Sequence, residues 1–298
     1  MTRVLIAESV NASLAPLAGL DVDERAGIWR DRDKLLAAVR ECEGLIVRNE
    51  TRVDEALVDA AGALRVVGRL GAGLDNIDQD ALRRRSIELV HGGGLNARAV
   101  AEYVLGACFT LARRIVLSDR EVREGKWVRH VGFELRGQTL GVIGLGATGA
   151  ETARLALRVG LEVLGYDPFL PAPPGVAQVD LPDLLSRSRI ITIHVPLTDS
   201  TRHLVSAEAL AQLPKGALVV NAARGGVLDE DALLAALESG HIGGAALDVR
   251  VQEPSSRSDP LARRDDVLLT AHIAGLTSES QEAVAAHVLS GVRDALTR

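Results

Sequence analysis

Three glycines stand in a fixed pattern near the middle of the chain, in the segment Gly144-Leu145-Gly146-Ala147-Thr148-Gly149. An apolar run over residues 139–143 precedes the segment, and helical periodicity follows it. This context predicts a strand, a tight turn and a helix whose first N–H groups face an anion. The pattern alone is weak in a chain with 29 glycines, but its position favours a dinucleotide site formed by Gly144, Gly146, Ala147, Thr148 and Gly149.

An acidic residue ends the next predicted strand. Asp167 lies 18 positions after Gly149 (167 − 149). A carboxylate at this place accepts hydrogen bonds from the ribose hydroxyls of the adenosine and repels a 2′-phosphate. The residues that follow, Pro168 and Phe169, include no arginine to bind such a phosphate. The sequence therefore predicts NAD as the cofactor, with a solvated loop aspartate as the alternative.

Short apolar strands alternate with helical segments along the chain, which is typical of the α/β class with parallel sheets. We expect a first series of strands at 4–7, 44–48, 65–68 and 87–90, with helices at 34–42, 53–61 and 79–85. A second series has strands at 139–143, 162–166, 190–195, 217–221, 244–249 and 267–271, with helices at 150–158, 181–188, 207–212 and 231–237. One long helix is predicted over 97–124 and a last amphipathic helix over 278–298.

Composition excludes several classes of protein. With 34 basic and 40 acidic residues the net charge is −6, which argues against a nucleic-acid-binding surface. Cys42 and Cys108 lack a CxxC partner and favour a reducing compartment. The N-terminus does not look like a signal peptide, and no apolar run reaches about 18 residues. We expect a cytoplasmic protein that binds neither nucleic acid nor membrane.

Three polar residues, Arg224, Glu253 and His272, follow apolar runs in the second half of the chain. Ligands of open α/β sheets bind at the carboxyl ends of the strands, so these side chains are expected to converge. An arginine holds a carboxylate through two parallel hydrogen bonds, and a histidine exchanges protons near neutral pH. A neighbouring glutamate orients the imidazole and favours its protonated form. Together they predict reversible oxidation of a 2-hydroxy acid beside a nicotinamide.

Each of these residues also has a purely structural interpretation. A single histidine is usually structural, and a Glu-Pro pair is usually a solvated turn. For Arg224 the alternative is a surface arginine in a glycine turn, which the preceding apolar strand disfavours. A metal site formed by His272, Glu253 and Asp248 is a further alternative, but it lacks a second histidine at ligand spacing. The sequence therefore predicts no metal.

Ordered motifs over essentially the whole chain give a clear resemblance. They are residues 68–76 (GRLGAGLDN), 100–102 (VAE), the glycine pattern, 194–198 (HVPLT), 221–225 (NAARG), Asp248-Val249 followed by Glu253-Pro254, and 272–275 (HIAG). The chain resembles the D-isomer-specific 2-hydroxyacid dehydrogenases, in particular short phosphoglycerate dehydrogenases without a C-terminal regulatory domain.

The resemblance implies two α/β domains. Residues 96–275 are expected to form a Rossmann-type, doubly wound NAD-binding domain. Residues 1–95 and 276–298 are expected to form a smaller, flavodoxin-like, discontinuous substrate domain, and a cleft between the two would close on the reactants. Family members form homodimers through the cofactor domain, and the apolar face of the predicted 97–124 helix agrees with that.

The resemblance also implies roles for individual residues. Arg224 would bind the substrate carboxylate, His272 would transfer the proton and Glu253 would hold the second imidazole nitrogen. The expected contacts to NAD, besides the glycine turn and Asp167, come from His194, Val195, Pro196, Ala222, Ala223 and Asp248, the last of these at the nicotinamide carboxamide.

The expected substrate is a small 2-hydroxy or 2-keto acid with an anionic distal group. By resemblance the backbone amides of Leu70, Gly71, Ala72 and Gly73 would hold the carboxylate, while Arg48, Arg69 and, across the dimer, Arg129 would bind a phosphate. This favours 3-phosphoglycerate, whereas an arginine-rich composition is the alternative explanation of the three arginines.

One segment departs from the family pattern. Residues 91–95 (HGGGL) replace an Asn-x-Pro-type segment, which leaves sulfolactate, hydroxypyruvate and glyoxylate open as substrates. Formate- or phosphite-oxidising relatives fit the arginines less well. A non-catalytic, NAD-sensing binding protein is the alternative from another functional class.

Overall fold

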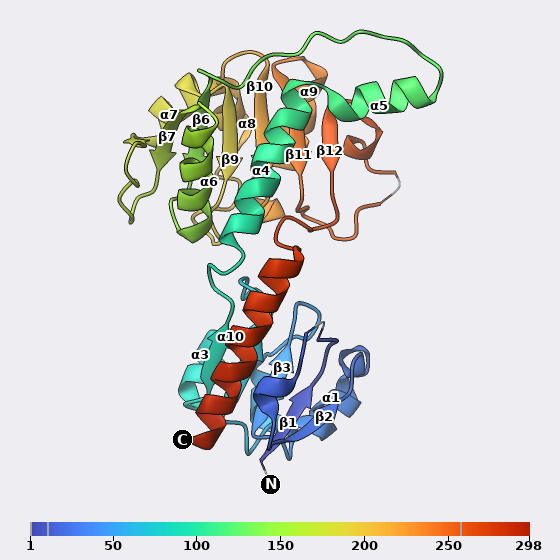
Figure 1. Ribbon diagram of the computed structural model, residues 1–298, viewed down its shortest axis with the longest axis vertical. Helices are drawn as coiled ribbons and strands as arrows, with labels where there is room; N and C mark the ends of the chain where they lie inside the picture. Colours follow the sequence, from blue (N-terminus) through green and yellow to red (C-terminus); the bar gives the residue numbers. More distant parts are fainter. Residues whose placement is uncertain (1, 11, 257) are drawn as a thin grey trace. The chain divides into compact units, whose positions relative to one another are not determined.

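The computed structural model describes residues 2–10, 12–256 and 258–298. The chain divides into two compact units (Figure 1). Unit 1 comprises Met1–Asn96 and Leu276–Arg298, and unit 2 comprises Ala97–Gly275.

Unit 1 contains a five-stranded parallel sheet in the order β2-β1-β3-β4-β5. This order is that of flavodoxin-like sheets. The strands are β1 (Arg3–Ile6), β2 (Asp21–Glu24), β3 (Gly44–Val47), β4 (Val66–Arg69) and β5 (Glu88–His91). The helices are α1 (Arg32–Val39), α2 (Glu55–Ala60), α3 (Gln79–Arg84) and α10 (Ser278–Thr297), with short 3-10 turns at Ala15–Leu17 and Ile28–Arg30.

Both faces of this sheet are covered, because its strands alternate between two apolar clusters. Leu45 packs with Leu57 of α2 on one face. The next residue, Ile46, packs with Val288 of α10 on the other. Helix α10 lies so close to β4 that a Cβ at Gly68 would be 2.6 Å from a methyl group of Val292. The C-terminal helix is therefore an integral part of the first unit.

Unit 2 contains a seven-stranded parallel sheet in the order β12-β11-β10-β9-β6-β7-β8. Its strands are β6 (Thr139–Ile143), β7 (Glu162–Tyr166), β8 (Ala177–Gln178), β9 (Ile190–Ile193), β10 (Ala217–Asn221), β11 (Ile242–Leu247) and β12 (Val267–Leu269). The chain runs outward from β6 on one side and then returns to β9 on the other, so the strand order reverses between β6 and β9. This is the switch point of a doubly wound, Rossmann-type sheet, and it confirms the predicted fold.

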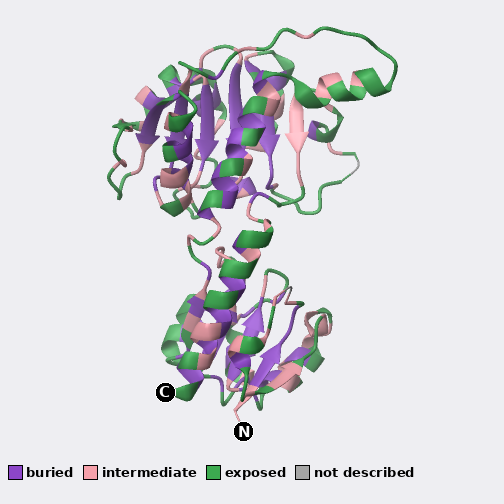
Figure 2. Ribbon diagram, viewed as in Figure 1, coloured by how far each residue is buried: buried purple, intermediate pink, exposed green. Residues whose placement is uncertain are grey.

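Helices cover both faces of this sheet as well. They are α4 (Ala97–Ala112), α5 (Ile115–Arg123), α6 (Ala147–Arg158), α7 (Leu181–Arg187), α8 (Ala207–Gln212) and α9 (Glu230–Glu238), with 3-10 turns at Gly225–Val227 and Leu261–Arg263. One apolar cluster includes residues of α4 and α6, and the other includes residues of α7, α8 and α9. Figure 2 shows the central strands buried between helices whose outer faces are exposed.

The prediction of a single helix over 97–124 is wrong. Helix α4 ends at Ala112, and Arg114 adopts a left-handed conformation with a φ of 53° before α5 begins. The Ala112 carbonyl accepts a hydrogen bond of 3.0 Å from the N–H of Phe133, which lies on the returning chain. Every residue of α5 is at least partly exposed, so its apolar positions do not continue the buried face of α4.

Two strands were not predicted. β2 is an edge strand with the sequence Asp-Val-Asp-Glu, and its three acidic residues leave no apolar run that would predict a strand. β8 is only two residues long and also lies at an edge. The other predicted strands are present with ends shifted by a few residues, as at β9, which ends at Ile193 instead of 195.

Candidate active site

The glycine turn has the geometry that a phosphate site needs. Gly144 has a φ of +95°, and a Cβ there would be 2.8 Å from the His194 carbonyl oxygen. A Cβ at Gly149 would be 1.9 Å from the Gly144 carbonyl oxygen, so the backbone of α6 contacts the backbone of the turn directly. At Gly146, the N-cap of α6, a Cβ would meet no described atom within 4 Å. The N-terminus of a 12-residue helix therefore faces open space, which fits a pyrophosphate.

Asp167 lies directly after β7 and beside this turn. One carboxylate oxygen accepts a hydrogen bond of 2.8 Å from Leu145 N, inside the glycine motif. The other accepts from Phe169 N and Leu170 N at 2.8 and 3.0 Å. Burial opposes ionisation of the carboxyl, but these three N–H donors outweigh it and lower the pKa of Asp167. The structure thus places an ionised carboxylate next to the glycine turn, where a ribose can be bound.

The loops after β9 and β10 carry five of the residues expected to contact NAD. His194, Val195 and Pro196 follow β9, and Ala222 and Ala223 follow β10. His194 N donates to the Ile143 carbonyl at 2.7 Å, and its Nε2 lies 3.0 Å from the Thr192 hydroxyl. Burial lowers the pKa of His194 to about 4, so the ring is neutral at physiological pH.

Arg224 follows the same strand β10. The buried Asn221 holds the turn from both sides: its amide nitrogen donates to the Arg224 carbonyl at 3.0 Å, and its side-chain oxygen accepts from Ala223 N at 3.1 Å. The Arg224 guanidinium donates to the Ala223 carbonyl at 2.6 Å. The arginine is half-buried, and it lies at the carboxyl end of the sheet.

Glu253 and His272 form a hydrogen-bonded pair. Nδ1 of His272 lies 2.9 Å from Oε2 of Glu253. The second glutamate oxygen accepts a hydrogen bond of 2.9 Å from Arg250 N, which fixes the carboxylate. The side chains of the pair are about half exposed, 51% for His272 and 40% for Glu253. With Nδ1 engaged by the glutamate, Nε2 is the ring nitrogen that is left for a reactant.

The turn that carries His272 is organised by Asp248, which is buried. Its two oxygens accept hydrogen bonds from Ile273 N, Ala274 N and the Thr270 hydroxyl at 2.8, 2.8 and 2.6 Å. Thr270 in turn lies 2.6 Å from the Tyr103 hydroxyl, and burial raises the pKa of Tyr103 to about 12. Tyr103 and Thr270 carry no motif, so sequence reasoning missed them. Asp248 holds the turn that carries His272, and its contact with the nicotinamide carboxamide stays a prediction.

The arginines expected to bind a distal anion separate into two groups. Arg48 and Arg69 lie at the carboxyl ends of neighbouring strands of unit 1, after β3 and at the end of β4. Arg129 belongs to unit 2, on the exposed segment after α5. The structure brings Arg48 and Arg69 to the carboxyl end of one sheet, and the contribution of Arg129 from a partner subunit stays a prediction.

Three residues for which the sequence predicted no role hold Arg48 in place. The buried carboxylate of Glu8 accepts hydrogen bonds from the N–H groups of Arg48, Glu50 and Thr51 at 2.8 to 3.2 Å. The amide of Asn76 donates to the carbonyls of Arg48 and Thr51 at 2.8 and 2.7 Å. Gln281 of α10 accepts a hydrogen bond of 2.8 Å from the Arg48 guanidinium.

The loop over residues 70–73 adjoins this edge. Leu70 N donates to the Val47 carbonyl and Gly71 N to the Arg69 carbonyl, both at 2.8 Å. Two of the four amides expected to bind the substrate carboxylate are therefore engaged within unit 1. A Cβ at Gly71 would be 1.4 Å from an Arg69 nitrogen, which shows that the guanidinium lies over this loop. His91 ends the next strand, and burial, with Arg69 and His287 nearby, lowers its pKa.

Within the described ranges, no three His, Cys, Asp or Glu side chains gather in a way that could hold a metal ion. Among the same residues, no helix is long and apolar enough to cross a membrane.

Comparison with known proteins decides the family. Residues 105–274, more than half of the chain, match the model of the D-isomer specific 2-hydroxyacid dehydrogenase, NAD binding domain. The chain belongs to this family. Its unit 2 is therefore an NAD-binding domain, and the expectation of an NAD-dependent 2-hydroxyacid dehydrogenase is confirmed at the level of the family.

Relatives extend the similarity over the whole chain. An (S)-sulfolactate dehydrogenase of Chromohalobacter salexigens is 42% identical over 99% of both chains. A D-3-phosphoglycerate dehydrogenase of Archaeoglobus fulgidus is 41% identical over 94% of this chain but only 54% of its own length. The chain spans about half the length of the phosphoglycerate dehydrogenases it matches. Among solved structures, the TT0316 protein from Thermus thermophilus has a TM-score of 0.92 at 31% identity, covering 99% of this chain and 97% of its own.

Proposed function

We propose that this protein interconverts a D-type 2-hydroxy acid and its 2-keto acid, with His272 as the general acid and base. The observation that carries the proposal is the Glu253–His272 pair at 2.9 Å. His272 lies on a turn at the carboxyl end of the same sheet as the glycine motif. Bound NAD supplies the hydride acceptor in the oxidation and NADH the donor in the reduction. The protein's own contribution is to place the acid and to transfer the proton.

In the direction of oxidation, the C2 hydrogen leaves as hydride and the C2 hydroxyl proton moves to Nε2 of His272. The carboxylate of Glu253 on Nδ1 stabilises the imidazolium that forms. In the reverse direction the imidazolium returns the proton to the C2 oxygen. The hydrogen bond from Arg250 N to Glu253 holds this carboxylate within hydrogen-bonding distance of the ring.

Arg224 has the chemistry to bind the substrate carboxylate and to polarise the C2 carbonyl, since its planar guanidinium matches a carboxylate with two parallel hydrogen bonds. The Asn221 contacts fix the backbone of its turn. Since the amides of Leu70 and Gly71 already donate to backbone carbonyls, we assign any amide contact to the substrate carboxylate to Ala72 and Gly73.

For the substrate we propose a three-carbon acid with a phosphate or sulfonate on C3. Arg48 and Arg69 support this, because two guanidinium groups at neighbouring strand ends suit an oxyanion. 3-Phosphoglycerate and sulfolactate share this chemistry, and the relatives include enzymes named for each. Hydroxypyruvate and glyoxylate lack the C3 anion and are the alternatives.

We further propose a homodimer formed through unit 2. The segment from α5 onward exposes Ile115, Val116, Val122, Trp127 and Val131, with Trp127 at 78% and Val131 at 93% exposure. Apolar side chains this exposed mark a protein interface.

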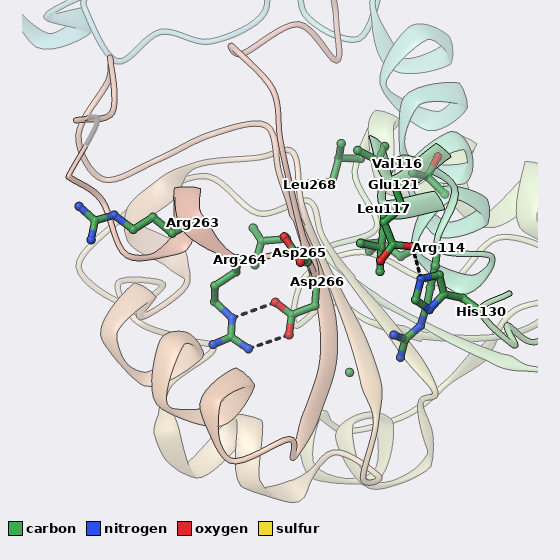
Figure 3. Close-up of a pocket in the computed structure, with 14 residues that line it drawn as sticks. Arg114, Val116, Leu117, Glu121, His130, Arg263, Arg264, Asp265, Asp266 and Leu268 are labelled. Atoms are coloured by element: carbon green, nitrogen blue, oxygen red, sulfur yellow. Dashed lines mark hydrogen bonds and ion pairs between the residues drawn. The ribbon is translucent and has the colours of Figure 1, made fainter. Parts of the chain in front are cut away.

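A pocket of about 540 Å³ lies beside this segment, between α4, α5 and β12 (Figure 3). The Glu121–His130 and Arg264–Asp266 pairs line it, at 2.5 and 2.7 Å. In a dimer formed through this surface, Arg129 of each subunit would lie in the interface.

We propose a reducing, cytoplasmic environment, which the buried, free thiols of Cys42 and Cys108 support.

NADH absorbance in the presence of a panel of acids tests the substrate class. The panel contains 3-phosphoglycerate, both enantiomers of sulfolactate, D-lactate, D-glycerate, hydroxypyruvate and glyoxylate. We expect turnover of a phosphorylated or sulfonated acid with a kcat/KM at least about tenfold above that for D-lactate, because a lost charged hydrogen bond costs about 1.5–3 kcal/mol. Preferential turnover of acids without a C3 anion would refute the substrate class. Tight NADH binding without any turnover would favour an NAD-sensing protein.

A further inference from the structure

A buried arginine with two carboxylate partners lies behind the Glu253–His272 pair. Arg250, in the loop after β11, has a side chain that is only 9% exposed. Its Nε and Nη2 lie 3.1 and 2.8 Å from the two oxygens of Glu230, at the first position of α9. Its Nη1 lies 2.6 Å from Oδ2 of Asp259. Two carboxylates from different segments thus hold one guanidinium.

The same group of residues fixes the backbone of the loop. Oε1 of Glu230 also accepts a hydrogen bond of 2.8 Å from Val251 N. Arg250 N donates to Oε1 of Glu253 at 2.9 Å, and Oε2 of Glu253 lies 2.9 Å from Nδ1 of His272. An unbroken series of contacts therefore runs from Glu230 through Arg250 and Glu253 to the imidazole.

The turn after Arg224 rests on the same peptide. A Cβ at Gly225 would be 2.1 to 2.3 Å from the carbonyl carbon and oxygen of Arg250 and from Val251 N. Only glycine permits this approach, so the two loops are in direct backbone contact. A shift of the Arg250 peptide would displace the Arg224 turn and the Glu253 carboxylate together.

The charges of the group are mutually stabilising. Burial disfavours the charged guanidinium, but Glu230 and Asp259 outweigh it and raise the pKa of Arg250. Burial likewise opposes ionisation of Asp259, and the guanidinium with nearby backbone N–H groups outweighs it, so the pKa of Asp259 is lowered. A buried charge persists only with such partners. Arg250 and Asp259 therefore stay ionised across the pH range in which a dehydrogenase works.

We propose that Arg250 is a positioning residue for the acid–base pair: held by Glu230 and Asp259, it fixes the peptide N–H that orients Glu253 and, through Glu253, His272. The inference rests on the proposed catalytic role of His272. It assigns a function to a side chain that touches neither the substrate nor the cofactor in the proposed reaction.

The test replaces the guanidinium by a side chain of similar length, Arg250→Met, in the full-length protein. The matched control is Arg3→Met, since Arg3 also forms ion pairs with two carboxylates, Asp23 at 2.7 Å and Glu41 at 2.9 Å. Arg3 lies at the amino end of β1 in unit 1, whereas the candidate site lies at the carboxyl ends of strands. The carboxylates of Glu230 and Asp259 are half-buried, so the loss of their partner can make Arg250→Met fold poorly. In that case the same measurements are made on the triple variant Glu230→Gln/Arg250→Met/Asp259→Asn, which removes those charges.

The readouts are kcat for keto-acid reduction, the Kd of NADH from fluorescence and the ring-proton NMR chemical shifts of His272. We expect Arg250→Met to lower kcat about tenfold to a hundredfold, because a misplacement of about 1 Å costs up to about a hundredfold, with the Kd of NADH changed less than about twofold. Arg3→Met should change none of these.

Two results would overturn the inference. One is a kcat and a set of His272 chemical shifts for Arg250→Met that match those of Arg3→Met. The other is a loss of NADH affinity in parallel with kcat, which indicates general destabilisation. His272→Asn separates this failure from that of the proposed function: an inactive His272→Asn beside a fully active Arg250→Met refutes only the positioning role, whereas an active His272→Asn refutes both. The ring-proton NMR chemical shifts of His272 should differ from the wild type in Arg250→Met and match it in Arg3→Met, a readout that needs no turnover.

Discussion

Alanine substitutions at two glycines of one turn should separate stability from cofactor binding. At Gly149, the new methyl group would stand 1.9 Å from the Gly144 carbonyl oxygen, whereas ordinary contacts begin at 3.4 Å. About 1.5 Å of displacement is needed between two backbone segments (3.4 − 1.9). At Gly146 the methyl group would meet no described atom within 4 Å, and the φ of −62° and ψ of −173° suit alanine.

These distances give the expected magnitudes. Gly149→Ala should lower the free energy of unfolding by about 1–3 kcal/mol, the usual cost of overpacking. For a unit of this size each kcal/mol lowers the Tm by about 2–4 °C. Gly146→Ala should leave the Tm unchanged or raise it slightly, because alanine reduces the entropy of the unfolded chain. It should nevertheless raise the Kd of NADH at least about tenfold, or about 1.4 kcal/mol, because the methyl group occupies the approach of the pyrophosphate.

Thermal unfolding followed by circular dichroism and NADH titration followed by fluorescence separate the two effects. Gly146→Ala with wild-type Tm and weakened NADH binding, beside Gly149→Ala with a lower Tm, is the expected pair of results. Wild-type NADH affinity in Gly146→Ala would refute the phosphate site at this turn. A wild-type Tm in Gly149→Ala would refute the tight packing of α6 on Gly144.

Three further substitutions test separate parts of the account. Asp167→Ala should weaken NADH binding and improve the ratio of NADPH to NADH affinity, measured by fluorescence, because it removes the ribose acceptor and its repulsion of a 2′-phosphate; an unchanged ratio would place the ribose elsewhere. His194 has a folded-state pKa of about 4, below the ordinary 6.5, so its contribution to stability is lost as pH falls from about 6.5 to 4. Urea unfolding should show a smaller loss of unfolding free energy over this interval in His194→Gln than in the wild type, and equal losses would contradict the neutral ring. Arg48→Met should lower kcat/KM for the C3-anionic acid about tenfold or more while leaving D-lactate within about twofold, and an equal loss for both would indicate a structural role.

The elements with strong apolar patterns could be predicted from the sequence. The central strands β6, β9 and β10 are buried on both faces, and their continuous apolar runs locate them within a few residues. The glycine turn was also predictable, for a different reason: only glycine fits where a Cβ would lie 1.9 Å from another backbone segment. In these places one local pattern has one structural solution.

The remaining features depend on contacts between distant positions. The break at Arg114 follows from the chain returning to cap Ala112 through Phe133, and the pattern of 97–124 alone gives no sign of it. The edge strand β2 is stabilised by pairing with β1 and not by apolar residues of its own.

The same holds for the supports of the candidate site. Glu8 accepts a hydrogen bond from Arg48 N, 40 residues away in the sequence, and Arg250 binds Glu230, 20 residues away. A buried carboxylate or guanidinium has no periodicity, so its role becomes visible only when its hydrogen-bond partners are known. The sequence therefore predicted residues at strand ends and missed those that hold them in place.

The most direct test of the central claim is the rate of NADH oxidation by His272→Asn with the keto acid that the wild type reduces fastest. General acid–base catalysis contributes about a hundredfold to ten-thousandfold, so kcat should fall by at least about a hundredfold while the Kd of NADH stays within about twofold. A kcat within about threefold of the wild type would contradict the assignment of His272 as the group that moves the proton.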